Sequence, residues 1–293
     1  MCKILVFSLA ILITWSGSAW AIDFWAGVEK ATLGEPAQVF QGMGDFPKLN
    51  PIKAESYKER YDPITMVGAG GQVKLKAGKS GESFVSEEPL SAGSYYVLAS
   101  SIASFASRTP DGLVRKSKTE EPSATTCSYG GNFGKALVYL PPAPEAPEAP
   151  EAPEADGAPE ASPAAEASEA PEASGAAEAG EDSFVIKPVG QKLELVPQIN
   201  PQKIKVGEKF PVKVLFDDQP LASANLGAFF VGFTEGNKAL AFSETTNEEG
   251  LVEIIPLRPG QWLAKVSKSG PYSDLSVCDR ETYAASLVFT VAP

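Results

Sequence analysis

Residues Lys209–Phe216 read KFPVKVLF and are followed directly by the turn-forming stretch Asp217-Asp218-Gln219-Pro220. Apolar and polar side chains alternate through the first stretch, which is typical of a β-strand with one buried face. Four similar short strands are expected later in the chain, at Ala228–Phe233, Leu251–Ile255, Trp262–Val266 and Ala285–Val291. Their spacing predicts an all-β sandwich, and neither half of the chain contains a convincing amphipathic helix.

Two motifs recur in the same order in both halves of the chain. Leu33–Phe40 (LGEPAQVF) aligns with Val206–Lys213 (VGEKFPVK), and Pro89–Tyr95 (PLSAGSY) aligns with Pro256–Trp262 (PLRPGQW). A Gly-Glu pair is typical of a turn that opens a strand. The second motif predicts a tight turn that sends a large ring into the core. We therefore expect two β-sandwich units of related topology.

The segment 141–182 between these units has a different composition. It contains 12 of the 37 acidic residues and no Lys or Arg, and Pro-Glu-Ala repeats from Pro144 to Glu154. Because it lacks large apolar side chains, it is predicted to be a disordered acidic linker between sandwich domains at 22–140 and 183–293. The rest of the chain has 25 acidic and 25 basic residues, and this neutral balance gives no steering toward nucleic acid.

Residues 1–21 have the pattern of an export signal. Lys3 precedes the apolar run Ile4–Trp15, and Ala19-Trp20-Ala21 is a small-x-small cleavage site. The apolar run is too short to span a membrane, so we expect cleavage to leave a periplasmic chain that begins at Ile22 and has no membrane span.

The cysteines predict one disulfide. Cleavage removes Cys2 and leaves Cys127 and Cys278, and an even pair in an exported protein usually forms a bond. The two cysteines occupy matching places in the repeat, each ahead of a closing strand. Halves packed about a pseudo-two-fold axis would bring them together near that axis. The alternative is two buried free thiols.

Candidate chemistry is sparse. The chain has no histidine, which excludes imidazole as a general base or a metal ligand. Asp217-Asp218 is typical of a turn, and Asp274 and Asp279 lack the dense spacing of a calcium loop. Gly68–Gly71 lacks the Lys-Ser/Thr of a phosphate loop and predicts a hairpin turn. A glycosidase would need two facing carboxylates, and no pair is indicated. We expect no catalytic residues, no cofactor and no enzymatic activity.

Five aromatic residues are consistent with core packing or with the lining of a ligand groove: Trp25, Phe229, Phe230, Phe233 and Trp262. Core packing is the better default for large apolar rings. Trp25 differs because it lies close to the predicted mature N-terminus, where an anchored strand and an exposed contact are both consistent with the sequence. It is therefore a candidate contact residue.

Four stretches point to a family: Ile22–Trp25, Gly42–Pro47, Gly190–Pro201 and Val214–Ala222. Together they resemble an uncharacterised family of exported bacterial β-proteins, a domain of unknown function associated with nickel or cobalt uptake systems. The resemblance implies a periplasmic, non-enzymatic protein with Ig-like or transthyretin-like β-sandwich domains. It also implies a role in presenting metal or another solute to a transporter.

The chain departs from this family at two positions. Family members carry His before the acidic-Phe-Trp triplet and a second His before the acidic-Phe-Pro triplet, and here these positions are Ile22 and Gly44. The residues that remain as candidate metal ligands are Asp23 and Asp45, whose carboxylates bind nickel or cobalt weakly on their own.

The leading hypothesis is a non-enzymatic periplasmic binding or accessory protein that serves a nickel, cobalt or other solute transport system. Its expected partner is a membrane transporter component or another envelope protein. The alternative is a structural or adhesion-like module of the cell envelope, which the duplicated units and the spacer also favour.

Overall fold

The computed structural model describes residues 23–48, 52, 57–79, 81–143, 183–200, 203–234 and 239–292. These residues form an all-β fold that includes the short helix α1 (Tyr57–Arg60), so the predicted fold class is confirmed. No helix in this part of the chain is long and apolar enough to cross a membrane. The predicted signal peptide and nearly all of the predicted linker lie outside the described residues, so both stay predictions.

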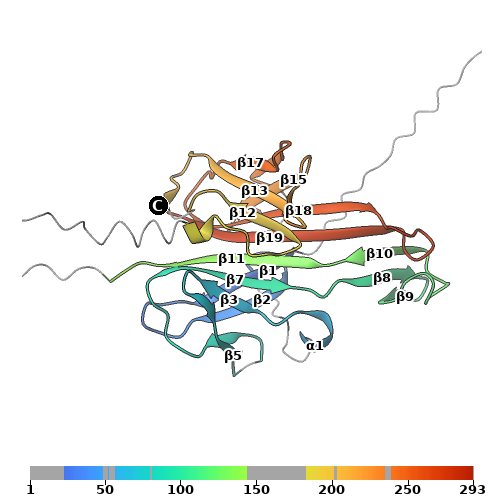
Figure 1. Ribbon diagram of the computed structural model, residues 1–293, viewed down its shortest axis with the longest axis horizontal. Helices are drawn as coiled ribbons and strands as arrows, with labels where there is room; N and C mark the ends of the chain where they lie inside the picture. Colours follow the sequence, from blue (N-terminus) through green and yellow to red (C-terminus); the bar gives the residue numbers. More distant parts are fainter. Residues whose placement is uncertain are drawn as a thin grey trace, which may run out of the picture.

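The strands pack in three layers, which Figure 1 shows from the side. The N-terminal sheet forms one outer layer and runs in the order β1 (Asp23–Lys30), β2 (Gln38–Gly44), β6 (Phe84–Ser86) and β5 (Leu75–Ala77). The C-terminal sheet forms the opposite outer layer and contains β12 (Leu193–Pro197), β13 (Phe210–Phe216), β14 (Gln219–Pro220) and β17 (Leu251–Ile254).

The central sheet lies between these layers and contains strands from both halves. Its main path runs in the order β16 (Phe242–Thr245), β15 (Asn225–Phe230), β18 (Gly260–Pro271), β19 (Arg280–Val291), β11 (Asn132–Leu140), β7 (Gly93–Ser100), β3 (Thr65–Gly68) and β4 (Gly71–Val73). Three further strands extend it at one end: β8 (Ser104–Thr109), β9 (Gly112–Val114) and β10 (Thr126–Gly130).

The two halves join through the parallel pairing of β11 with β19. Five residue pairs form this contact, from Asn132↔Ala284 to Ala136↔Val288. An edge strand leaves its N–H and C=O groups unpaired, and each of these two strands satisfies the open edge of the other. The halves are therefore joined edge to edge by main-chain hydrogen bonds within one continuous sheet.

The strand order of the central sheet is the same when read from either end. β11 corresponds to β19, β7 to β18, β3 to β15 and β4 to β16. A pseudo-two-fold axis that runs along the strands keeps β11 and β19 parallel and turns the halves toward opposite faces of the sheet. The prediction of two units of related topology is thus confirmed.

The first repeated motif makes the same turn in both halves. Gly34 N–H donates to Leu90 O at 2.9 Å, and Gly207 N–H donates to Pro256 O at 2.9 Å. Both glycines have positive φ, 76° and 84°, a region in which a Cβ is unfavourable. Glu35 N–H donates to Thr32 O and Glu208 N–H donates to Lys205 O, so the two copies of the motif form the same turn although their acceptors, Leu90 and Pro256, differ by one aligned position.

The second motif places an equivalent aromatic ring in each half. The Tyr95 hydroxyl donates to Ser91 O at 3.0 Å, and Trp262 Nε1–H donates to Arg258 O at 3.0 Å. Both side chains are buried, Tyr95 in the N-terminal core and Trp262 in the C-terminal core. Each turn thus satisfies the polar atom of the ring that it sends inward.

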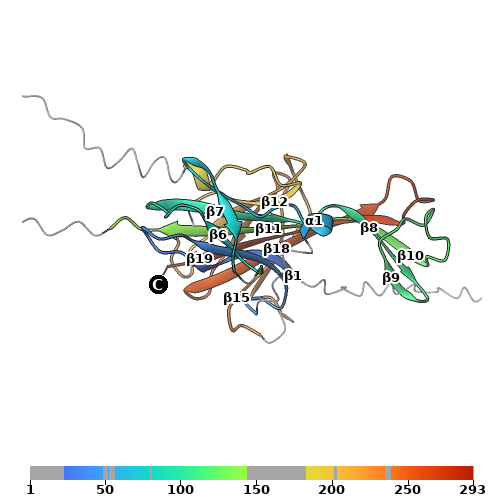
Figure 2. The same ribbon diagram turned by 90° about the horizontal axis from the view of Figure 1, so that it is seen from below.

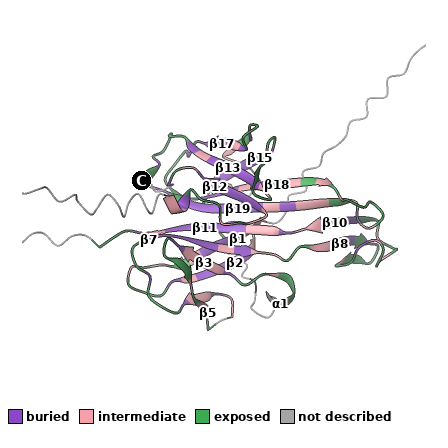
Figure 3. Ribbon diagram, in the orientation of Figure 1, coloured by how far each residue is buried: buried purple, intermediate pink, exposed green. Residues whose placement is uncertain are grey.

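Two hydrophobic cores lie on opposite faces of the central sheet (Figure 3). On β19, Leu287 and Phe289 belong to the C-terminal core, whereas the intervening Val288 belongs to the N-terminal core. On β7, Tyr96 enters the C-terminal core although it comes from the N-terminal half. Alternation along a strand therefore makes each half contribute to the core of the other.

A buried ion pair lies between the halves. Lys135 on β11 pairs with Glu194 on β12, and both side chains are almost fully buried. Glu194 also accepts hydrogen bonds from the backbone N–H groups of Val189, Gly190 and Gln191. Burial lowers the pKa of Lys135, and the adjacent carboxylate opposes this effect.

Tyr96 completes this buried polar cluster. The Lys135 ammonium lies 4.8 Å from the centroid of the Tyr96 ring, and the Tyr96 hydroxyl donates to Val185 O at 2.6 Å. Burial, with a smaller contribution from the Glu194 charge, raises the pKa of Tyr96, so the hydroxyl keeps its proton and its hydrogen bond. The cluster thus holds the first residues of the C-terminal half against the N-terminal half.

Lys135→Met is expected to lower the free energy of unfolding by about 3–5 kcal/mol, because it leaves Glu194 buried without its cation. The Lys135→Met/Glu194→Leu double variant removes both charges, but it also frees the N–H groups of the 189–191 turn. We therefore expect only partial recovery. Urea denaturation measures both values, and exposed Lys76→Met is the matched control. A loss below 1 kcal/mol for the single variant would contradict the assignment.

The isolated C-terminal half, residues 183–293, is expected to aggregate when it is produced alone. It would expose the long β19 edge and the apolar surface that Tyr96 and Leu137 cover. Co-expression with residues 22–143 is expected to restore a soluble complex. Size-exclusion chromatography and circular dichroism measure both outcomes, and a monomeric, folded C-terminal half would refute the expectation.

Candidate functional site

An arm of the central sheet extends beyond both cores (Figure 2). We define the arm as β8, β9 and β10, the ends of β18 and β19 from Ser269 to Pro271 and from Arg280 to Thr282, and the 272–279 loop. β10 pairs with β8 in antiparallel fashion and with β19 in parallel fashion. The arm therefore contains strands from both halves and extends their shared sheet.

A disulfide between Cys127 and Cys278 closes the arm. The S–S distance is 2.00 Å, the Cα atoms are 5.0 Å apart, and the residues are separated by 151 positions. The same interval separates Ala136 from Leu287, the equivalent core residues of β11 and β19, so the bond joins equivalent positions near the pseudo-two-fold axis. The predicted pairing is confirmed.

Asp279 reinforces the disulfide. Its carboxylate pairs with Lys118 and accepts a hydrogen bond from Cys127 N–H at 2.7 Å. The Lys118 hydrogen bond, followed by the Cys127 N–H, lowers the pKa of Asp279. Asp279 thus stays ionised at neutral pH and ties the 115–125 loop to the cysteine strand. Asp274 instead accepts from Ser276 N–H and Oγ–H within its own turn.

Asp217 and Asp218 form the predicted turn after β13. Their φ angles are 49° and 60°, and the turn connects β13 to β14. Asp217 pairs with Lys192 at 2.7 Å on the surface. The side chain thus takes part in local turn and surface contacts.

The two metal candidates lie at the same end of the N-terminal sheet. Asp23 lies opposite Gly44 in the β1–β2 pairing, next to Asp45. The Asp23 carboxylate pairs with Lys265 of the C-terminal half at 2.8 Å. In the described part of the chain, no three acidic or cysteine side chains come together to hold a metal ion. Asp23 therefore links β1 to the other half through a charge that already has a cationic partner.

Trp25 lies in the N-terminal core at 3% exposure. Its ring packs edge-on against Phe40 and Phe46, with centroids 5.1 and 5.0 Å away, and Phe46 in turn contacts Phe229 of the other half. The contact partners of Trp25 are thus within the molecule. Phe230 packs against both Phe233 and Trp262 at 5.0 Å.

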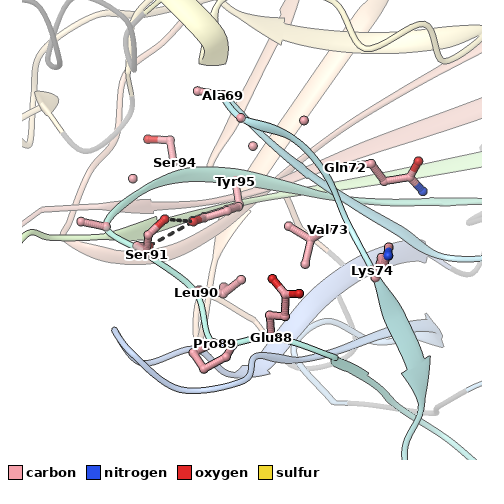
Figure 4. Close-up of a pocket in the computed structure, with 15 residues that line it drawn as sticks. Ala69, Gln72, Val73, Lys74, Glu88, Pro89, Leu90, Ser91, Ser94 and Tyr95 are labelled. Atoms are coloured by element: carbon pink, nitrogen blue, oxygen red, sulfur yellow. Dashed lines mark hydrogen bonds between the residues drawn. The ribbon is translucent and has the colours of Figure 1, made fainter.

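A cleft of about 350 Å³ lies in the N-terminal half. Its walls are the predicted hairpin turn at Gly68–Gly71, which connects β3 to β4, and the turn of the second motif at 88–94. Figure 4 shows Val73, Leu90 and Glu88 around the space beside Tyr95. Ser91 Oγ is 3.0 Å from the Tyr95 hydroxyl. The cleft therefore combines an apolar floor with polar groups at its rim.

The duplication explains why this cleft is open. Gly68 pairs with Tyr95 on the neighbouring strand, and Phe230 occupies the equivalent place beside Trp262. The Phe230 ring packs on Trp262, and Arg258 lies 5.2 Å above the Phe230 ring. The N-terminal half has glycine in place of Phe230 and Ser91 in place of Arg258. The Tyr95 ring therefore lies directly over Gly68, and the cleft opens beside this ring where the N-terminal half has no counterpart of the Phe230 and Arg258 side chains.

Gly68 is required for this arrangement. A Cβ at this position would lie 2.8 Å from the Tyr95 ring, too close for ordinary contact. Sequence reasoning identified Gly68–Gly71 as a turn and missed the cleft. A residue-by-residue comparison of the two copies, Ser91 with Arg258 and Gly68 with Phe230, contained the signal.

The fold places the chain in a class of all-β proteins with two related halves on a shared central sheet. The chain belongs to the family described as Domain of unknown function (DUF4198), whose model matches residues 61–270. This confirms the expected membership of a family of unknown function; the export of its members and their link to nickel or cobalt uptake stay predictions. No curated protein matches the chain in sequence.

Two solved structures align along most of the chain. The D00-D0 domain of Intimin is 11% identical with a TM-score of 0.20, and the alignment covers 91% of this chain and 99% of that one. The D0-D1 domain of Intimin is 14% identical with a TM-score of 0.19, and the alignment covers 91% and 97% of the two chains. At these TM-scores neither alignment carries an argument about function.

Replacement of both Cys127 and Cys278 by Ala is expected to lower the free energy of unfolding by at most about 5 kcal/mol, the chain-entropy value for so long a loop. The β11–β19 pairing should remain, because its hydrogen bonds do not depend on the bond. Chemical denaturation measures the loss, and hydrogen exchange should show faster exchange in the arm than in the cores. Equal acceleration throughout the molecule would contradict a local role.

Proposed function

We propose that this protein is a non-enzymatic, exported binding or accessory module of the cell envelope that docks onto a membrane transporter component through its arm. The observation that carries the proposal is the arm itself. It extends beyond both cores and is closed by a disulfide, a bond that persists in oxidising compartments outside the cytosol.

The end of the arm presents large apolar side chains to solvent. Leu113 on β9 is 72% exposed and Leu275 in the 272–279 loop is 62% exposed. Figures 1 and 2 both place β9 and this loop at the same end of the molecule. Exposed leucines on a braced scaffold favour a protein partner, because the scaffold loses little conformational freedom on binding.

A non-enzymatic role is supported by the chemistry of the chain. The sequence has no histidine, and the carboxylates of Asp23, Asp217 and Asp279 each pair with a lysine. The pairing of Asp23 with Lys265 also favours a solute other than a transition metal as cargo. Titration of the tag-free protein with nickel and cobalt tests this point, and heat of binding at micromolar metal would contradict it.

The alternative role is a structural or adhesion-like envelope module. The continuous central sheet favours it, because main-chain hydrogen bonds between the halves suit a stiff connecting element. The two roles differ in what contacts the arm, a transporter component in one case and a surface polymer or matrix protein in the other.

Site-specific photo-crosslinking in the native host separates these roles. A photoreactive residue at Leu113 or Leu275 is expected to capture a transporter component. Leu257 is the matched control, because it is 56% exposed and precedes β18 at the end of that strand opposite the arm. Capture of surface polymer or matrix protein supports the alternative, and equal yields at Leu257 and Leu275 refute docking through the arm.

A further inference from the structure

We propose that the cleft between the Gly68–Gly71 turn and the 88–94 turn binds a small zwitterion, a free α-amino acid with an apolar side chain. This inference deepens the proposed binding role and rests on it. The ligand class follows from three features of the cleft: its unpaired charges, its floor and its size.

The first feature is a pair of opposite charges that have no partners. Lys74 and Glu88 both line the cleft, both are exposed, and among the described residues neither forms an ion pair. Elsewhere on the surface, lysines such as Lys30 and Lys209 pair with nearby glutamates at 2.6 Å. The cleft thus leaves one positive and one negative group open to a ligand.

These charges select for a ligand that carries both signs. The Glu88 carboxylate attracts an ammonium group, and the Lys74 ammonium attracts a carboxylate. A simple anion meets Glu88 as a like charge, and a simple cation meets Lys74 in the same way. The α-amino and α-carboxylate groups of one amino acid supply both of these charges.

The second and third features concern shape. Val73, Leu90 and the Tyr95 ring provide an apolar surface in the cleft that Lys74 and Glu88 also line. A volume of about 350 Å³ lies at the lower end of the range for small-molecule sites. An apolar side chain is expected to pack on this surface, as the Phe230 ring packs on Trp262 in the other half.

The pseudo-symmetry makes this a single site in the described fold. Phe230 and Arg258 occupy the equivalent space in the C-terminal half. The protein thus contains its own plugged version of the cleft, and Ser91→Arg recreates part of that plug. The Tyr95 bond to the Ser91 backbone carbonyl does not depend on the Ser91 side chain, so the turn should survive this change.

The affinity is expected to be weak, because exposed charge pairs contribute little in water. Loss of one such contact weakens binding by about 2–5-fold. The test therefore uses a method that detects millimolar binding: NMR titration of the tag-free mature protein with its disulfide intact. The probes are leucine, N-acetyl-leucine, leucine amide and the doubly blocked N-acetyl-leucine amide.

Leucine is expected to shift the amide signals of residues 68–73 and 88–94, and the doubly blocked compound is expected to leave them unchanged. Glu88→Gln should weaken leucine binding and leave the affinity for N-acetyl-leucine equal or higher. Lys74→Gln should weaken leucine binding and leave the affinity for leucine amide equal or higher. Ser91→Arg should abolish binding, and Lys76→Gln, outside the cleft, should have no effect.

Two results would overturn the inference. One is the absence of shifts in the cleft with leucine at tens of millimolar, and the other is equal binding of the blocked and unblocked compounds. Thermal unfolding of each variant separates lost binding from lost folding. Arm crosslinking in the native host reports on the proposed function independently, so failure at the cleft and failure at the arm are distinguishable.

Discussion

The parallel pairing of β11 with β19 is the interaction on which the rest of the structure depends. It converts two half-sheets into one and fixes the pseudo-two-fold axis along the strands. Because that axis turns the halves toward opposite faces, each outer sheet packs against residues from both. The arm depends on the same pairing. β10 directly precedes β11 in the chain and extends its line beyond the cores, where β10 keeps a parallel contact with β19.

Main-chain hydrogen bonds, buried charge and a covalent bond reinforce this junction at different points. Lys135 and Glu194 meet where the first strand of the C-terminal half crosses β11. A buried ion pair is a poor source of net stability, but it penalises arrangements that separate its partners. Cys127 and Cys278 act at the far end, in the arm, which lies outside the two hydrophobic cores described above. The main-chain hydrogen bonds, the ion pair and the disulfide together favour one arrangement of the two halves.

The two halves share the second motif but differ in the surface that they form around it. Both copies keep the turn, the inward ring and the hydrogen bond to the backbone, because these features support the core. The copies differ directly beside that ring, where Phe230 and Arg258 correspond to Gly68 and Ser91. These differences separate the half that contains the cleft from the half in which Arg258 packs on the Phe230 ring.

The strands, the repeat and the disulfide pairing were predictable from the sequence, because alternation, turn residues and the matching positions of the cysteines are visible along the chain. The edge-to-edge junction was not, since a strand that pairs on both sides has the same pattern as one at an edge. The cleft and the Lys135–Glu194 pair could not be predicted from the sequence either. The sequence does not distinguish Lys135, which is buried, from Lys76, which is exposed. Burial and the filling of space depend on residues far apart in the chain, and only the tertiary structure brings those together.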